Sequence, residues 1–141
     1  MPLTDIWTLF GQIDTATHNF TPTSWSVNHH PGANTKATIT KAAVTGKRHI
    51  ATTLTVTLAA GAAAPTATVV SVSVIDGASG GATYLWGPHD VSIPAVAGAL
   101  NGIALPVWLP ATLSTAITIE FSAAAGANTL EAVTLCGITV A

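Results

Sequence analysis

Charged side chains are scarce in this sequence. Only 7% of its 141 residues are Asp, Glu, Lys or Arg, against roughly 25% in ordinary soluble domains. Because charge normally keeps proteins apart in solution, so neutral a surface predicts that partners cover much of it. The cations number four, Lys36, Lys41, Lys47 and Arg48, which is too few for a nucleic-acid footprint, and we expect no nucleic-acid partner.

Cysteine is almost absent as well. The single Cys136 excludes an internal disulfide and gives no sign of an oxidising compartment. Because it lies in an apolar run, we expect an inert thiol in the core. The first ten residues lack a basic stretch ahead of the apolar ones, so they do not resemble a signal peptide, and we expect synthesis in the cytoplasm.

No run is long and apolar enough for a membrane span. The most apolar stretch, 54–75, alternates with Thr and Ser and is interrupted by Gly61 and Pro65. We therefore expect no membrane partner.

What the sequence does contain is strand pattern. Half of it is hydrophobic, mainly Ala and Val, and much of the rest is Thr and Ser, a mixture that favours pleated strands. Between Ile50 and Leu58 the even positions are mostly apolar, while Thr53, Thr55 and Thr57 lie between them, which is the period of a strand with one buried face. The spacing predicts eight strands, at 36–44, 48–60, 66–76, 82–87, 89–95, 102–109, 115–122 and 129–140.

Turn and proline signals complete the fold prediction. Asn101-Gly102 is a hairpin signal, and Pro94, Pro106 and Pro110 predict edge or bent strands. The last run, 132–140, is apolar on both faces, so it is either a central strand or one whose outer face meets another subunit. We expect an all-β, jelly-roll-like antiparallel β-sandwich at 36–141.

An N-terminal arm is expected to precede the sandwich at 1–35. Leu3, Ile6, Trp7 and Phe10 share one face of a possible short helix. From Gln12 to Thr35 the sequence is polar and without period. It is punctuated by Phe20 and Trp25, which we expect to act as aromatic anchors.

Histidines and carboxylates are present, but their spacing does not match a known metal-binding or catalytic motif. Adjacent His29 and His30 point opposite ways on an extended chain, which suits joint metal binding poorly. His89-Asp90 has no nucleophile motif nearby. Glu120 and Glu131 would act as an acid/base pair only if they shared a cleft. We therefore predict no catalytic, metal or cofactor residue, and a protein that is not an enzyme.

Two groups of side chains are candidates for binding. Lys41, Lys47 and Arg48 form either a solvated strand end or a docking patch for an acidic neighbour. The aromatic residues are either core and interface anchors or a platform for a sugar ring; they are Trp25, Tyr84, Trp86 and Trp108.

Three segments carry a resemblance: ATITKAAVTGKRHIATTLTVTL, IDGASGGATYLW and NTLEAVTLCGITV. Together, over about residues 33–141, they resemble the capsid decoration or cement proteins of tailed bacteriophages, which have a jelly-roll-like sandwich. The resemblance implies a structural virion protein without cofactors on the capsid exterior. It also implies that the protein binds the major capsid protein across subunit joints and associates with itself as a homodimer or homotrimer.

From the residues we expect the partner-binding set to be Trp7, Phe10, Phe20, Trp25, Lys41, Lys47 and Arg48. The alternative function is a glycan-binding jelly-roll module of a phage tail fibre or spike, since jelly rolls also serve as lectins. That alternative requires an exposed Trp or Tyr beside Asp76, His89 or Asp90 in a concave loop face.

Overall fold

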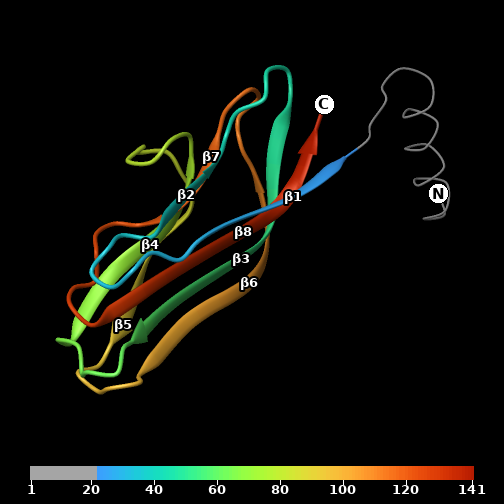
Figure 1. The fold of residues 1–141 in the computed structure, drawn as a ribbon. Helices are drawn as coiled ribbons and strands as arrows, with labels where there is room; N and C mark the ends of the chain where they lie inside the picture. Colours follow the sequence, from blue (N-terminus) through green and yellow to red (C-terminus); the bar gives the residue numbers. More distant parts are fainter. Residues whose placement is uncertain (1–21) are drawn as a thin grey trace, which may run out of the picture.

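The computed structural model describes residues 22–141. These residues form eight strands and no helix, so among them there is no helix that could cross a membrane. In chain order the strands are β1 (Thr23–His29), β2 (Thr38–Lys41), β3 (Arg48–Ala60), β4 (Thr68–Asp76), β5 (Tyr84–Ile93), β6 (Leu100–Pro110), β7 (Ile117–Phe121) and β8 (Thr129–Val140) (Figure 1).

The strands form two antiparallel sheets of four. The strand order is β1-β8-β3-β6 in the first sheet and β2-β7-β4-β5 in the second. Every loop except the one between β4 and β5 therefore carries the chain from one sheet to the other. This is the arrangement of an eight-stranded jelly roll, and it confirms the predicted fold.

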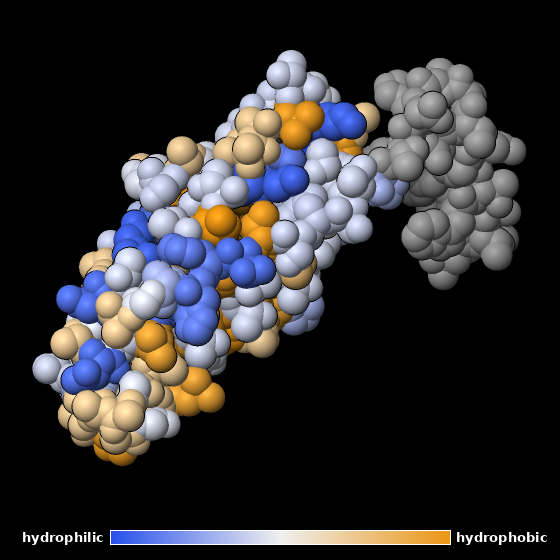
Figure 2. Space-filling model, viewed as in Figure 1, coloured by the Kyte–Doolittle hydropathy of each residue, from blue (hydrophilic) through white to orange (hydrophobic). Residues whose placement is uncertain are grey.

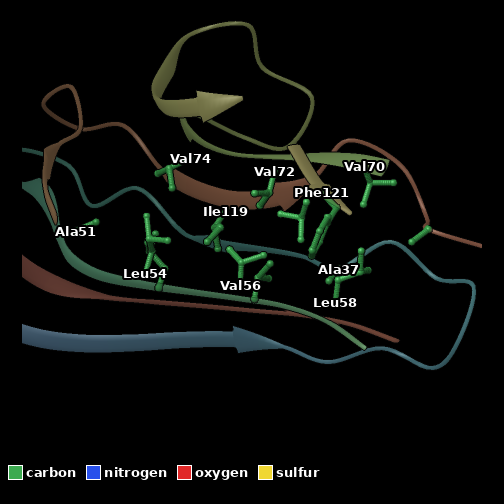
Figure 3. Packing of buried hydrophobic residues seen from close by; sticks show 14 of the residues in the cluster. Ala37, Ala51, Leu54, Val56, Leu58, Val70, Val72, Val74, Ile119 and Phe121 are labelled. Atoms are coloured by element: carbon green, nitrogen blue, oxygen red, sulfur yellow. The ribbon is translucent and has the colours of Figure 1, made fainter. Parts of the chain in front are cut away.

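The core lies between the two sheets (Figure 3). Leu54, Val56 and Leu58 of β3 are fully buried, while the threonines between them are not, so strand alternation sends the apolar side chains inward. They face β4 and β7, whose buried residues include Val72, Val74, Ile119 and Phe121. Each such side chain stabilises the fold by about 1.5–3 kcal/mol when fully buried.

Several predicted strands are present as expected. β3 and β8 have the predicted bounds, β8 is central, and the proline-containing β6 is an edge strand. The predicted strands 82–87 and 89–95 are one strand, β5, whose pairing with β4 is irregular on either side of Val74. Asn101-Gly102 lies inside β6 rather than at a hairpin. At Gly102 a Cβ atom would come within 2.7 Å of the Val56 carbonyl oxygen, so close strand packing accounts for this glycine.

β1 is the strand that the sequence analysis missed. Thr23–His29 pairs residue by residue with β8, from Thr23 opposite Thr139 to His29 opposite Val133. The segment assigned to an arm outside the sandwich thus contains an edge strand of the first sheet. Its inward positions Trp25 and Val27 alternate with Ser and Asn, a pattern too short and polar to stand out.

Register places three loops at one end of the sandwich: 42–47, 77–83 and 111–116. β1 begins and β8 ends at this same end, since Thr23 is opposite Thr139 and Arg48 is opposite Val140. The C-terminus lies there too (Figure 1). The other four loops, 30–37, 61–67, 94–99 and 122–128, lie at the opposite end.

Candidate interaction surface

Three of the four cations lie together at the end where β2 and β3 are joined. Lys41 ends β2, Lys47 lies in the turn and Arg48 begins β3. Lys47 and Arg48 are exposed and Lys41 is half-buried. We call this the basic end, defined by Lys41, Lys47 and Arg48.

The β2–β3 turn at the basic end is held by hydrogen bonds to Ser114 in the loop 111–116. The Lys47 backbone N–H donates to the Val44 carbonyl at 3.0 Å, and the Ser114 N–H donates to the Lys47 carbonyl at 2.8 Å. The Gly46 N–H donates to the Ser114 hydroxyl at 2.8 Å. These bonds fix the backbone that carries the cations, so little of it needs to be ordered on binding.

Ion pairing distinguishes the fourth cation from these three. Lys36 Nζ lies 2.8 Å from Glu120 Oε2. Within residues 22–141, no carboxylate lies within 4 Å of the charged groups of the basic end. The side-chain carboxylate at that end, of Asp76, accepts hydrogen bonds from the Thr112 N–H and hydroxyl at 2.9 and 2.5 Å.

The predicted aromatic anchors divide into two groups. Trp7, Phe10 and Phe20 lie outside the described residues. Trp25 is half-buried on β1 and packs against the core, and its ring meets that of His49 edge-on at 5.8 Å. Trp25 thus has a packing role in the sandwich itself.

His49 is fully buried beneath the basic end. Its Nε2 lies 2.8 Å from the Ala42 carbonyl oxygen and its Nδ1 2.8 Å from the Thr139 hydroxyl. Because a carbonyl can only accept, Nε2 carries the proton and Nδ1 accepts from Thr139. The ring therefore ties the β2–β3 turn to the end of β8.

Glu120 and Glu131 do not share a cleft. Glu120 alternates with Ile119 and Phe121 of the core, so it lies on the outer face of the second sheet. The β4–β5 loop folds over it: the Ser79 hydroxyl and the Gly80 N–H both donate to its carboxylate. Burial raises the pKa of Glu120, but the hydrogen bonds from Lys36, Ser79 and Gly80 and the charge of Lys36 outweigh it, and the net pKa lies below the ordinary value.

Glu131 points into the sandwich at the opposite end and is 1% exposed. Its two oxygens accept the backbone N–H groups of Ala37 and Ala125, each at 2.7 Å. Burial raises its pKa above the ordinary value, although those two hydrogen bonds and Lys36 act against the rise. The carboxylate thereby ties together the β1–β2 and β7–β8 loops. The acid/base reading of Glu120 and Glu131 has no support in this geometry.

The histidines also have partners of their own. His29 Nδ1 accepts the Thr38 N–H at 3.1 Å, and the His89 ring lies 4.3 Å from that of Trp86. Among residues 22–141, no three His, Cys, Asp or Glu side chains gather as metal ligands would. His29, Glu120 and Glu131 thus each hold a loop or strand through hydrogen bonds.

The aromatic platform is dispersed. Trp86 packs partly against the core, whereas Tyr84 on β5 is 51% exposed and Trp108 on β6 is 64% exposed, in different sheets. An open hollow of about 310 Å³ at one edge of the second sheet is lined by Ala67–Val69 and Ser92–Pro94, without an aromatic ring. The concave face that the glycan-binding alternative requires is not formed by this hollow.

The outer face of the first sheet carries one charged side chain, Arg48 at the first position of β3, and is otherwise neutral. Beyond Arg48 and its partner Val140 at the rim, the outward side chains by register are Ser24, Ser26 and Asn28 of β1, Leu130, Ala132, Thr134, Cys136 and Ile138 of β8, Ile50, Thr53, Thr55, Thr57 and Ala59 of β3, and Leu100, Ala104, Pro106, Trp108 and Pro110 of β6. We call this surface the neutral face. Figure 2 shows one side of the molecule, on which hydrophilic and apolar residues are interleaved.

Cys136 belongs to the neutral face, which corrects the expectation of a core thiol. It is half-buried, and its Sγ lies 3.4 Å from the Ser26 hydroxyl. β8 is apolar on both sides, and its inward positions are those of Val133 and Leu135. Periodicity alone did not distinguish the two sides.

The neutral face as a whole escaped the sequence analysis, although its threonines on β3 were recognised as outward. Its other residues belong to β1, β6 and β8. These strands lie beside β3 in the sheet but are far from it in the sequence. Comparison with known proteins offers no further guidance, because neither a family model nor a curated protein matches this chain.

Proposed function

We propose that this protein is a structural virion subunit, a capsid decoration protein of the kind found on tailed bacteriophages. In this proposal it attaches to an acidic surface of the major capsid protein, on the outside of the head, through the basic end. The sequence resemblance and the jelly-roll fold, which recurs among viral capsid proteins, both support it.

The observation that carries the proposal is the placement of the cations. Lys41, Lys47 and Arg48 lie at one end of the sandwich, in and beside the hydrogen-bonded β2–β3 turn, and have no described carboxylate within 4 Å, while Lys36 is paired. In a chain with so little charge, this concentration favours docking to a negatively charged partner. The exposed apolar side chains of Val44 and Leu113, 39% and 51% accessible, lie in the loops of the same end and add contact area.

The arm strengthens this arrangement. The chain enters β1 at the basic end, because Thr23 is opposite Thr139 and Arg48 is opposite Val140. Trp7, Phe10 and Phe20 precede that point by at most 16 residues in the sequence. An arm and a basic patch that reach the same partner give avidity, and many copies on a lattice multiply it.

The test is a binding assay with purified, undecorated capsids, followed by imaging of the particles. We expect saturable occupancy that weakens steeply as salt is raised, because screening acts on exposed charges. The triple variant Lys41→Gln, Lys47→Gln, Arg48→Gln should lose at least about tenfold in affinity. Asp90→Asn, an exposed change away from the basic end, is the matched control and should bind normally.

Two outcomes would contradict the proposal. One is an absence of binding to the capsids at low salt by the wild-type protein. The other is equal loss of binding in the triple variant and in Asp90→Asn. Saturable quenching of tryptophan fluorescence by sugars, together with no capsid binding, would instead favour the glycan-binding alternative.

A further inference from the structure

We infer that the neutral face is the surface through which two copies of this chain associate, sheet against sheet. The inference rests on the first sheet alone and is independent of the capsid proposal. Three properties of the face lead to it: its neutrality, its extent and the distribution of tall and short side chains over it.

Neutrality points to a second copy as the occupant. Seven of the eight charged residues within 22–141 lie elsewhere, and the eighth, Arg48, alternates onto the outer side only at the first position of β3, at the rim of the face. A charged partner would gain nothing from such a face. In a two-fold interface each residue is presented to the same surface of the other copy, so a charge in the middle of the face would meet its own like or be buried unpaired, whereas Arg48 lies at the rim, where interfaces are polar.

The second sheet differs, because its outer face carries charge and is partly covered by a loop of the same chain. Its outer face carries Asp90 and Glu120, and the chain covers part of it with the β4–β5 loop through Ser79 and Gly80. No described segment covers the neutral face in this way, and Trp108 and Leu100 remain 64% and 72% exposed on it. Exposed large apolar side chains on a sheet face whose one charge lies at its rim are typical of an interface.

The extent of the face matches that of a stable dimer. Four strands about 4.8 Å apart, with about ten residues each at about 3.3 Å per residue, give a face of roughly 20 by 35 Å, or about 700 Å². A standard interface buries about 800 Å² on each partner. The small Ala and Thr side chains in the middle of the central strands β8 and β3 allow a second sheet to approach to the usual distance of about 10 Å.

Side-chain height gives the orientation. The tall residues Leu100 and Trp108 lie on one edge strand, β6, while the opposite edge strand, β1, presents only Ser24, Ser26 and Asn28. A two-fold axis in the interface and parallel to the strands places β6 of each copy over β1 of the other. Pro106 of β6 is level with Ser26 of β1, and Pro110 is level with Ser24. Trp108 lies between the two prolines. In the dimer, Trp108 of one copy therefore lies over the gap between Ser24 and Ser26 of the other copy.

Sedimentation velocity of the full chain over a range of concentrations tests this. We expect a dimer that dissociates on dilution. Thr55→Glu, at a half-buried outward position in the middle of the face, should raise its Kd by on the order of 30-fold or more, because it buries two like charges. Ser92→Glu is the matched control, an exposed strand position on the other sheet, and should leave the Kd unchanged.

Orientation is tested by Ser26→Trp, which would place a second indole where Trp108 of the other copy lies. It should weaken the dimer at least about tenfold, whereas Ser92→Trp should not. Ser26→Trp with undiminished dimerisation would overturn the orientation. A monomer at all concentrations, or a dimer equally sensitive to Thr55→Glu and Ser92→Glu, would overturn the inference.

The wild-type chain offers a test without any substitution. Cys136 is its single cysteine and lies on the neutral face. Its rate of modification by a bulky maleimide should fall at least about fivefold as the protein concentration rises through the dimer Kd, because dimerisation covers the thiol. A rate independent of concentration would contradict the inference even if Thr55→Glu failed to fold.

Discussion

The indole of Trp25 lies against Gly137 on the adjacent strand, so closely that a Cβ atom added to the glycine would stand 2.8 Å from its Cη2 atom. The same Cβ atom would collide with the Ile50 carbonyl oxygen on the other side. β8 therefore has no side chain at the one inward position where β1 places its largest one. This pairing of a large and an absent side chain fixes β1 on the sheet.

Gly137→Ala should accordingly destabilise the sandwich by about 2–3 kcal/mol, because the added methyl group must displace both the Trp25 ring and a backbone carbonyl. Urea unfolding followed by tryptophan fluorescence measures the change. Gly32→Ala is the matched control, since nothing lies within 4 Å of a Cβ atom there, and it should change the free energy of unfolding by less than about 0.5 kcal/mol. Equal stabilities of the two variants would contradict the role assigned to Gly137.

Glu120→Gln should destabilise the protein by about 1–3 kcal/mol at pH 7, because it removes the charge that Lys36 and the β4–β5 loop surround. The pKa of Glu120 is lowered in the folded state. The contribution of Glu120 to the free energy of unfolding is therefore present above the unfolded-state pKa and is lost as the pH falls through the folded-state pKa. The stability difference between wild type and variant should shrink in acid, and amide exchange at Gly80 should speed up in the variant.

Asp90→Asn is the control for Glu120→Gln. Asp90 is exposed and accepts one hydrogen bond, from the Ser71 hydroxyl at 2.7 Å, which an Asn oxygen can still accept. We expect a change of less than about 0.5 kcal/mol. If both variants lost the same stability, the clamp on the β4–β5 loop would not be the cause.

Glu131→Gln should also destabilise, but with the opposite response to pH. A glutamine has one side-chain oxygen, so one of the Ala37 and Ala125 N–H groups would lose its acceptor, at a cost of about 1–3 kcal/mol. The pKa of Glu131 is raised in the folded state. The contribution of Glu131 to the free energy of unfolding is therefore fully present below the unfolded-state pKa and is lost as the pH rises through the folded-state pKa.

The stability difference between wild type and Glu131→Gln should therefore widen as the pH falls from 7 towards 4. Urea unfolding at several pH values measures it, in parallel with the Glu120→Gln series. A difference that narrowed in acid for both variants would contradict the assignment for Glu131.

The predictability of the fold from sequence follows the strength of its periodicity. β3 has the predicted bounds because its apolar and threonine positions alternate over much of its length. The double-sided apolar run of β8 predicted either a central strand or one whose outer face meets another subunit, and β8 is central. β1 was missed because its strand character depends on pairing with β8, more than 100 residues away, and on the space that Gly137 leaves for Trp25. Local patterns do not contain that information.

The candidate sites were predictable only in part, for a related reason. Lys41, Lys47 and Arg48 are close in sequence, and all three lie at the same end of the sandwich. The loop-tying roles of Glu120 and Glu131 depend on the backbone N–H groups of Gly80, Ala37 and Ala125, which have no sequence signal.

The position of β1 sets where the arm can be removed. Deletion of residues 1–21 should leave a sandwich that unfolds cooperatively, because all the core strands lie within 22–141. Deletion of residues 1–30 should cost several kcal/mol or abolish folding, because it removes β1, uncovers the edge of β8 and strips Trp25 from the core. Circular dichroism and urea unfolding of the two truncations measure this. In the capsid assay, the shorter deletion should weaken attachment while the free energy of unfolding stays close to that of the full chain. If it unfolded the sandwich as the longer deletion does, the first 21 residues would belong to the folded body and could not be an anchoring arm.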